Sequence, residues 1–206
     1  MIHKIKFDDY PKQLFIDAIN SIKKPNISQN AYFSDSDNTP QIHSIEAFEW
    51  LNKKIKAAAI EYFDYLKADR YSEAEVDVYA QKSWLVELTD GGKVGWHRHR
   101  NAHISCVFYI DAPKDSCALQ FKDVENWEAV FPFSLKQSFY IDEPKVEKEV
   151  PVEDGLLIMF PSTLKHGTSI SNHVGSRLAV SYDLMVTSKT PYELITLDPK
   201  FWKLLD

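Results

Sequence analysis

The hydrophobic pattern of residues 44–66 is the clearest local signal in the chain. Apolar side chains recur there every three or four residues, which is the spacing of one face of a helix. The positions are Ile45, Phe48, Leu51, Ile55, Ala58, Tyr62 and Leu66. Residues 8–24 have a similar pattern, with Asp9 as a candidate N-cap and Pro11 in the first turn. The sequence therefore predicts two amphipathic helices that rest on an apolar surface.

From about residue 76 the pattern changes to one that is typical of β-strands. Residues 75–88 alternate between apolar and polar positions, and residues 103–110 are rich in β-branched and aromatic side chains. Residues 155–160, GLLIMF, form a continuous apolar run, as expected of a strand buried on both faces. Residues 176–186 form a further strand pattern. The order predicts a mainly β fold, a sandwich or jelly roll with an N-terminal helical layer on one sheet.

The length of the chain favours one domain. A chain of 206 residues buries about 70% of its unfolded surface, which is enough for a sizeable core. We expect a single domain over residues 1–206, with the helical layer in residues 1–75, the β core in residues 76–190 and a C-terminal tail in residues 191–206.

Charge and cysteine content exclude several classes of protein. The net charge of -6 argues against general affinity for nucleic acid or an anionic membrane. Two cysteines, Cys106 and Cys117, lie in apolar contexts and fit a reducing compartment. The first ten residues lack the apolar region of a signal peptide, and no run approaches the ~18 apolar residues of a membrane span. We expect a cytoplasmic protein; the sequence leaves a homodimer open.

The segment WHRHR, residues 96–100, carries the first candidate chemistry. In an extended chain His97 and His99 lie on the same face, where two imidazoles can bind one metal ion. A third ligand must come from elsewhere, and His166, just after the buried run, is the best candidate. His103 is the alternative to His99, but it lies about 13 Å along the strand at ~3.3 Å per residue, so a buried or supporting role suits it better.

The strand that begins near Arg177 carries the second candidate chemistry. By the same alternation Arg177, Ala179, Ser181 and Asp183 share one face. A guanidinium and a hydroxyl are the pair that a small dicarboxylate needs, a bidentate charge-assisted fork and one more hydrogen bond. The structural alternative is an ion pair of Arg177 with Asp183, which on a surface contributes less than ~1 kcal/mol.

These motifs together resemble those of the Fe(II)- and 2-oxoglutarate-dependent dioxygenases. The sequence WHRHRNAHISCVFYI, followed by GLLIMFPSTLKH and by an arginine after ten further residues, is similar to the small oxygenases of bacteria and phages. The resemblance covers roughly residues 80–185. It implies a double-stranded β-helix, a cupin-like jelly roll, with iron at its mouth. It also implies His97 and His166 as iron ligands, and Arg177, Ser181 and Tyr109 as residues that bind the distal carboxylate of 2-oxoglutarate.

Two positions depart from the resemblance. Most of the superfamily has a carboxylate where this chain has His99, so a third imidazole leaves the iron site one charge more positive. Asp183 is a candidate for the missing carboxylate, either as a metal ligand or as a group behind a ligand. We disfavour both roles. Cys106 replaces a glycine of the narrower family, a change that we expect to affect only packing.

The remaining candidates receive structural interpretations. We expect His3, His43 and His173 to be surface residues without partners, and Arg98 and Arg100 to be solvated charges, with a substrate-recruiting role at the rim as the minor alternative. Trp84 and Trp96 are expected to pack the barrel. Residues 88–96 and 122–145 are the loops in which we expect substrate selection.

The resemblance therefore implies an oxygenase that consumes 2-oxoglutarate and molecular oxygen, releases succinate and carbon dioxide, and hydroxylates a small-molecule or peptidyl substrate. The first alternative keeps three histidines on iron but does not use 2-oxoglutarate, as in three-histidine cupin dioxygenases. The second is a metal- or ligand-binding jelly roll with no turnover.

Overall fold

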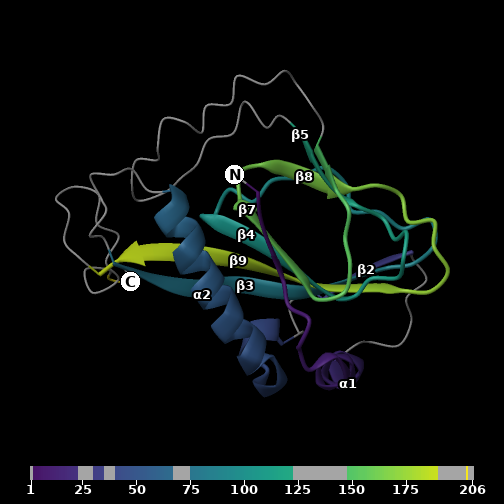
Figure 1. The fold of residues 1–206 in the computed structure, drawn as a ribbon, viewed down its shortest axis with the longest axis horizontal. Helices are drawn as coiled ribbons and strands as arrows, with labels where there is room; N and C mark the ends of the chain where they lie inside the picture. Colours follow the sequence, from purple (N-terminus) through teal and green to yellow (C-terminus); the bar gives the residue numbers. More distant parts are fainter. Residues whose placement is uncertain are drawn as a thin grey trace.

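Two antiparallel sheets and two helices make up the described part of the chain (Figure 1). The computed structural model describes residues 2–22, 30–34, 40–66, 75–122, 148–189 and 203. The large sheet has the order β1-β7-β4-β9-β3-β2, and the small sheet has the order β6-β5-β8. The strands are β1 (His3–Lys6), β2 (Ala31–Phe33), β3 (Val76–Leu88), β4 (Ile104–Asp111), β5 (Leu119–Lys122), β6 (Lys148–Val150), β7 (Leu156–Pro161), β8 (Lys165–Thr168) and β9 (Arg177–Ser188). The prediction of a mainly β fold is confirmed.

The helices cover one face of the large sheet. They are α1 (Lys12–Ile22) and α2 (Glu49–Leu66), and the 3-10 turns η1 (Ile42–Ser44) and η2 (Glu46–Phe48) precede α2. Their apolar faces share one core cluster with alternate residues of the sheet. On β4 these residues are Cys106, Phe108 and Ile110, each fully buried. Because side chains alternate along a strand, the residues between them point away from the helices.

The opposite face of the large sheet meets the small sheet. A second core cluster contains Tyr109 and Phe160 from the large sheet and Leu119 and Phe121 from the small one. The Phe121 and Phe160 rings lie edge to face with centroids 5.0 Å apart. This packing closes part of the space between the sheets, and the remaining space contains the candidate site.

The core against the helices makes a direct prediction for stability. Ile19 on α1 is 1% exposed, and its neighbour Ile22 is only half-buried. We expect Ile19→Val to lower the free energy of unfolding by about 1 kcal/mol, because one buried methylene is lost. Urea unfolding measures the change, with Ile22→Val as the matched control that loses less. Equal losses at the two positions would contradict the assigned helix face.

Three details of the N-terminal layer differ from the sequence prediction. Residues 3–6 and 31–33 are strands that pair with β7 and β3, so the layer is not purely helical. Segments this short have too few residues to show a period, and they become strands because an edge of the large sheet accepts them. The second helix begins at Glu49 after two 3-10 turns rather than near Ser44. The first helix begins at Lys12, too far from Asp9 for that residue to be its N-cap.

Among the described residues, no helix is both long enough and apolar enough to span a membrane. The predicted C-terminal tail lies outside the described residues except for Lys203. The division into a single domain stays a prediction.

Candidate active site

A cavity of about 490 Å³ lies between the two sheets. Its walls come from β3, β4 and β9 of the large sheet, from β8 of the small sheet and from residues 94–101. The N–H of Thr168 on β8 donates to the Val94 carbonyl at 3.1 Å, and the N–H of Val94 donates to the Thr168 hydroxyl at 2.9 Å. These two bonds fasten the segment that carries the candidate histidines to the rim of the barrel.

His97, His99 and His166 come together at this cavity. One ring nitrogen from each lies within 4.8 Å of those of the other two. The backbones of His97 and His166 form an antiparallel bridge, with N–H to carbonyl distances of 2.9 and 3.0 Å, and their ring centroids are 4.2 Å apart. The strand β4 begins only at Ile104, so His97 and His99 precede it, contrary to a strand that starts at His97. Both histidines still face the cavity.

Each of the three imidazoles is held by its Nδ1 atom. In His97 and His166 this atom lies 2.8 Å from the carbonyl oxygens of Gly95 and Leu164. In His99 it lies 2.6 and 2.7 Å from the two carboxylate oxygens of Asp183. Since carbonyl and carboxylate oxygens only accept, Nδ1 must be the donor in all three rings. The Nε2 atoms then keep their lone pairs, as a metal site requires.

Asp183 contacts His99, a role that the sequence interpretation disfavoured. The Ser105 hydroxyl donates to the same carboxylate at 2.7 Å, and Asp183 is only 3% exposed. Within the described residues Asp183 therefore pairs with His99 and not with Arg177, so the ion pair proposed as the structural alternative for Arg177 is wrong. Strand alternation placed Asp183 on the correct face, but the partner across the cavity depends on the fold.

Burial keeps the imidazoles of His97 and His166 neutral by lowering their pKa values. Desolvation, with a smaller contribution from His97, lowers the pKa of His166 to about 3. Desolvation also lowers the pKa of His97. A neutral imidazole is the form that binds a metal ion, so His97 and His166 are in the form needed for ligation near neutral pH.

A buried arginine lies in the same cavity. Arg177 is 2% exposed, and its Nη1 donates to the Cys117 carbonyl at 2.8 Å. Its guanidinium carbon lies 5.2 Å from the centroid of the Tyr109 ring. Arg177 Nε and the Tyr109 hydroxyl are both buried without a hydrogen-bond partner in the described structure. Such groups are costly to leave unpaired, and together they form a site for an anion.

Tyr109 and Ser181 complete that end of the cavity. Burial raises the pKa of Tyr109 to about 12, although Arg177 opposes the shift. The phenol is therefore neutral and can donate its proton to a carboxylate. Ser181 is buried and lies on the cavity face of β9 together with Arg177, as strand alternation predicted.

Trp84 is part of the site and does not only pack the barrel. Its ring stacks on His99 with centroids 5.5 Å apart and an interplanar angle of 29°. Trp96 is 37% exposed, with the Lys122 ammonium 4.2 Å from its ring centroid. The sequence interpretation missed the contact of Trp84 and the carbonyls that hold His97 and His166. Backbone acceptors leave no signal in a sequence.

The prediction that three other histidines are surface residues without partners is wrong. His173 is 7% exposed, and His3 and His43 are half-buried. The His3 ring stacks on Tyr62, and ring nitrogens of His43 and His173 lie 2.8 Å from the hydroxyls of Ser83 and Ser171. The sheets and helices around them were not visible in the local sequence.

His103 is buried, as expected, and supports a pH prediction. Its Nδ1 accepts the Val186 N–H at 3.0 Å, and burial lowers its pKa below 6.5. Its contribution to stability is therefore complete above pH 6.5 and is lost as the pH falls through the lowered pKa. We expect His103→Asn, which keeps an acceptor but cannot be protonated, to flatten the decline of the unfolding free energy on acidification. Urea unfolding of the metal-free protein between pH 7 and 5 measures both slopes, and equal slopes would contradict this role.

Comparisons with known proteins agree with this geometry. The model of the family described as "Putative 2OG-Fe(II) oxygenase" matches residues 82–183, which include the three histidines and Arg177. No curated protein matches the chain. Solved structures with the same fold match the chain at low sequence identity. Those that are 2-oxoglutarate oxygenases have the double-stranded β-helix. That prediction of the fold is confirmed.

Three solved structures illustrate the likeness. A 2OG-Fe(II) oxygenase family oxidoreductase from Burkholderia pseudomallei has 11% identity and a TM-score of 0.55, covering 88% of this chain and 84% of its own. The viral collagen prolyl hydroxylase vCPH from Paramecium Bursaria Chlorella virus-1, with 2OG, has 12% identity and a TM-score of 0.53, covering 89% and 94%. HygX from Streptomyces hygroscopicus, with nickel, 2-oxoglutarate and hygromycin B, has 11% identity and a TM-score of 0.55, covering 89% and 82%.

At these sequence identities the solved structures support the fold alone, whereas the family match supports the chemistry. That match begins within β3 and ends within β9, and so includes most of the residues that line the cavity. The chain belongs to the 2OG-Fe(II) oxygenases, enzymes that use Fe(II) and 2-oxoglutarate.

Proposed function

We propose that this oxygenase hydroxylates a C–H bond of a second substrate, with His97, His99 and His166 holding Fe(II) through Nε2. The observation that carries the proposal is the shared arrangement of the three imidazoles, each with Nδ1 bonded to an acceptor and Nε2 left for a metal. Neutral imidazoles are common ligands of iron, and three on one side leave open positions for other ligands.

Arg177, Tyr109 and Ser181 bind the distal carboxylate of 2-oxoglutarate in this proposal. The carboxylate satisfies the unpaired Nε of Arg177 and the unpaired hydroxyl of Tyr109. Cys117 holds the guanidinium in place through its carbonyl, so the fork is oriented before the ligand arrives. When bound, iron and 2-oxoglutarate supply the oxidising chemistry: one oxygen atom of dioxygen enters succinate and the other the substrate, with release of carbon dioxide.

Asp183 supplies the negative charge that a carboxylate ligand would otherwise bring. Its two oxygens lie within 2.7 Å of His99 Nδ1, so the charge reaches the site through the imidazole. A carboxylate in this position fixes the tautomer of a ligand and raises its basicity. Trp84, stacked on the same ring, restricts its rotation. This arrangement accommodates His99 where most of the superfamily has a carboxylate.

The alternative of a three-histidine dioxygenase that does not use 2-oxoglutarate is not favoured. It accounts for the histidines, but it gives no role to the buried Arg177 and Tyr109 groups that lack partners. A binding protein without turnover does not account for the family match.

Oxygen consumption together with succinate formation tests the proposed function. We expect both when the protein receives Fe(II), ascorbate and 2-oxoglutarate, and we expect neither in His166→Ala. Succinate formed without any dependence on Fe(II), or at the same rate in His166→Ala, would contradict the assignment of the histidines.

The cellular setting is also a proposal. Cys106 and Cys117 are both free and buried, which supports a reducing, cytoplasmic location. Molecular oxygen and 2-oxoglutarate are the cosubstrates of the family. The first loop predicted to select the substrate, residues 88–96, contributes Val94 and Gly95 to the wall of the cavity. In the second loop, residues 122–145, all but residue 122 lie outside the described residues.

A further inference from the structure

A second hollow lies against the outer side of the candidate iron site. It has a volume of about 350 Å³ and is lined by His97, Arg98, Arg100 and Lys165. His97 and Arg98 line the main cavity as well, so the two spaces adjoin at a candidate iron ligand. A molecule seated in this hollow therefore lies next to His97, and Arg177 lines the main cavity but not the hollow.

The hollow concentrates positive charge in an acidic protein. The chain has a net charge of -6, yet no acidic residue among the described ones lines this hollow. In the main cavity the only acid from the described ranges is Asp183, which is engaged with His99 and Ser105. The local field at the mouth is therefore opposite in sign to that of the whole molecule.

Two of the cations have no protein partner in the part of the chain that the structure describes. Neither the Arg100 guanidinium nor the Lys165 ammonium forms an ion pair or hydrogen bond there. The antiparallel register also sets Lys122 of β5 directly opposite Lys165 of β8. Lys122 adds positive charge beside the hollow, although its own ammonium lies 4.2 Å from the centroid of the Trp96 ring.

We propose that this hollow binds an acidic group, a carboxylate or a phosphate, of the substrate that is oxidised. The inference rests on the proposed function of the adjoining site. Arg177 already takes the distal carboxylate of 2-oxoglutarate at the buried end, so the outer cations serve a different anion. Arg100 offers a planar fork for two oxygens of that group, and Lys165 adds a point charge. The anchored anion then places the rest of the substrate next to His97.

The net charge of -6 disfavours a polyanion, so we infer a small acidic molecule or an acidic side chain as the substrate. A nucleic acid would meet repulsion from the surface around one such hollow. Arg100, interpreted from the sequence as a solvated charge, is thereby assigned the recruiting role that was the minor alternative.

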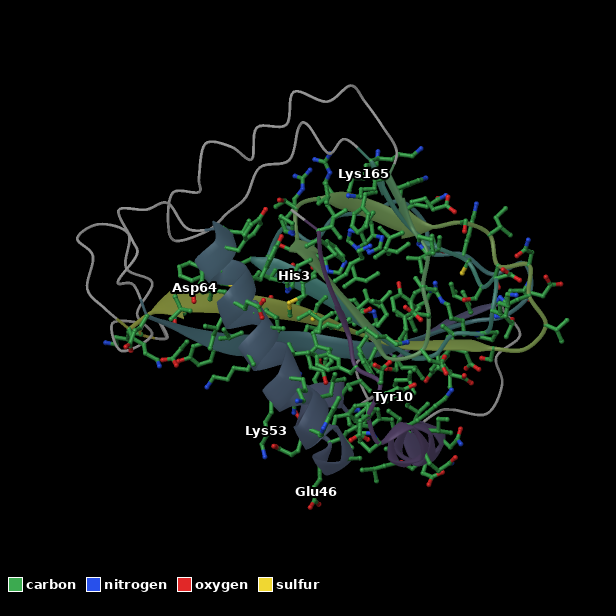
Figure 2. The ribbon with its side chains drawn as sticks, in the orientation of Figure 1. His3, Tyr10, Glu46, Lys53, Asp64 and Lys165 are labelled. Atoms are coloured by element: carbon green, nitrogen blue, oxygen red, sulfur yellow. The ribbon has the colours of Figure 1, made fainter. Side chains whose placement is uncertain are left out.

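Binding of methyl phosphate and of acetate, measured by calorimetry, tests the site without knowledge of the substrate. We expect one or both to bind wild type, and the tighter probe identifies the class of acid. Charge reversal in Arg100→Glu/Lys165→Glu should weaken that binding at least tenfold. The control is Lys53→Glu/Lys56→Glu, an equal change of charge on the exposed face of α2, and Figure 2 shows Lys53 on the side of the molecule away from Lys165.

The outcomes separate this inference from the proposed function. Binding of neither probe to wild type, or equal weakening in both double variants, would overturn the anion site. Manganese relaxation of the probe's nuclear resonance gives the second readout, because Mn(II) at the three histidines broadens the signal of a ligand in the adjoining hollow. If the probe binds and depends on Arg100 and Lys165 but Mn(II) does not bind, the iron site fails while the anion site stands. Broadening that survives the charge reversal would also contradict the inference.

Discussion

Replacing Arg177 with methionine is expected to weaken 2-oxoglutarate binding by about 100-fold to 1000-fold. Two charge-assisted hydrogen bonds and the ion pair are lost together, which amounts to roughly 3–4 kcal/mol. Calorimetric titration of 2-oxoglutarate into the protein loaded with Mn(II) measures the change. Tyr109→Phe, which removes one hydroxyl donor, is expected to cost about tenfold.

Methionine keeps much of the volume of Arg177, so the variant also has an informative effect on stability. In the ligand-free protein Arg177 Nε is buried and unpaired, and removing it is stabilising, whereas loss of the Nη1 bond to the buried Cys117 carbonyl costs about 1–3 kcal/mol. Because the two effects oppose each other, we expect the free energy of unfolding without ligand to change by less than about 2 kcal/mol. A variant that binds 2-oxoglutarate within threefold of wild type would refute the cosubstrate role, and one destabilised by well over about 3 kcal/mol would show that the arginine is mainly structural.

Replacing Asp183 with asparagine is expected to weaken Fe(II) or Mn(II) binding by about 10-fold to 100-fold, the usual effect of losing the acceptor behind a metal-binding imidazole. The side-chain amide removes the negative charge. It also allows a nitrogen to face His99 and donate to Nδ1, which would place the ring proton on Nε2 and block ligation. Anaerobic metal titration followed by calorimetry measures the loss.

Ser105→Ala is the matched control for Asp183→Asn. It removes one hydrogen bond to the same carboxylate but leaves the charge and the contact with His99. We expect a loss of metal affinity of only a few fold. If Asp183→Asn binds metal as tightly as wild type does while His166→Ala binds none, the contact of Asp183 with His99 does not contribute to metal binding.

The sequence was informative where a strand period or a spacing determines the geometry. Alternation placed Arg177, Ser181 and Asp183 on one face, and the structure puts all three on the wall of one cavity. The paired spacing of His97 and His99 likewise led to the same cavity, although residues 98–103 are not a regular strand. In these cases a local backbone rule is enough to predict which side chains meet.

Other features depend on partners that are distant in the chain and were not predictable. His99 and Asp183 are 84 positions apart, and their contact follows from how β9 lies beside β4. The strands β1 and β2 exist because β7 and β3 offer open edges to short segments. His173 was expected on the surface, but the fold buries it against Ser171. Such contacts are set by tertiary structure, which residue patterns over a few positions do not encode.

The most direct test of the iron and 2-oxoglutarate sites is an anaerobic titration of the metal-free protein with Fe(II) and then 2-oxoglutarate, followed by visible spectroscopy. We expect a metal-to-ligand charge-transfer band in wild type, the same band at much higher 2-oxoglutarate concentration in Arg177→Met, and no band in His166→Ala. A wild-type protein that binds Fe(II) but forms no band at saturating 2-oxoglutarate would contradict this expectation. Binding of 2-oxoglutarate unchanged in His166→Ala would contradict the placement of the iron at the three histidines.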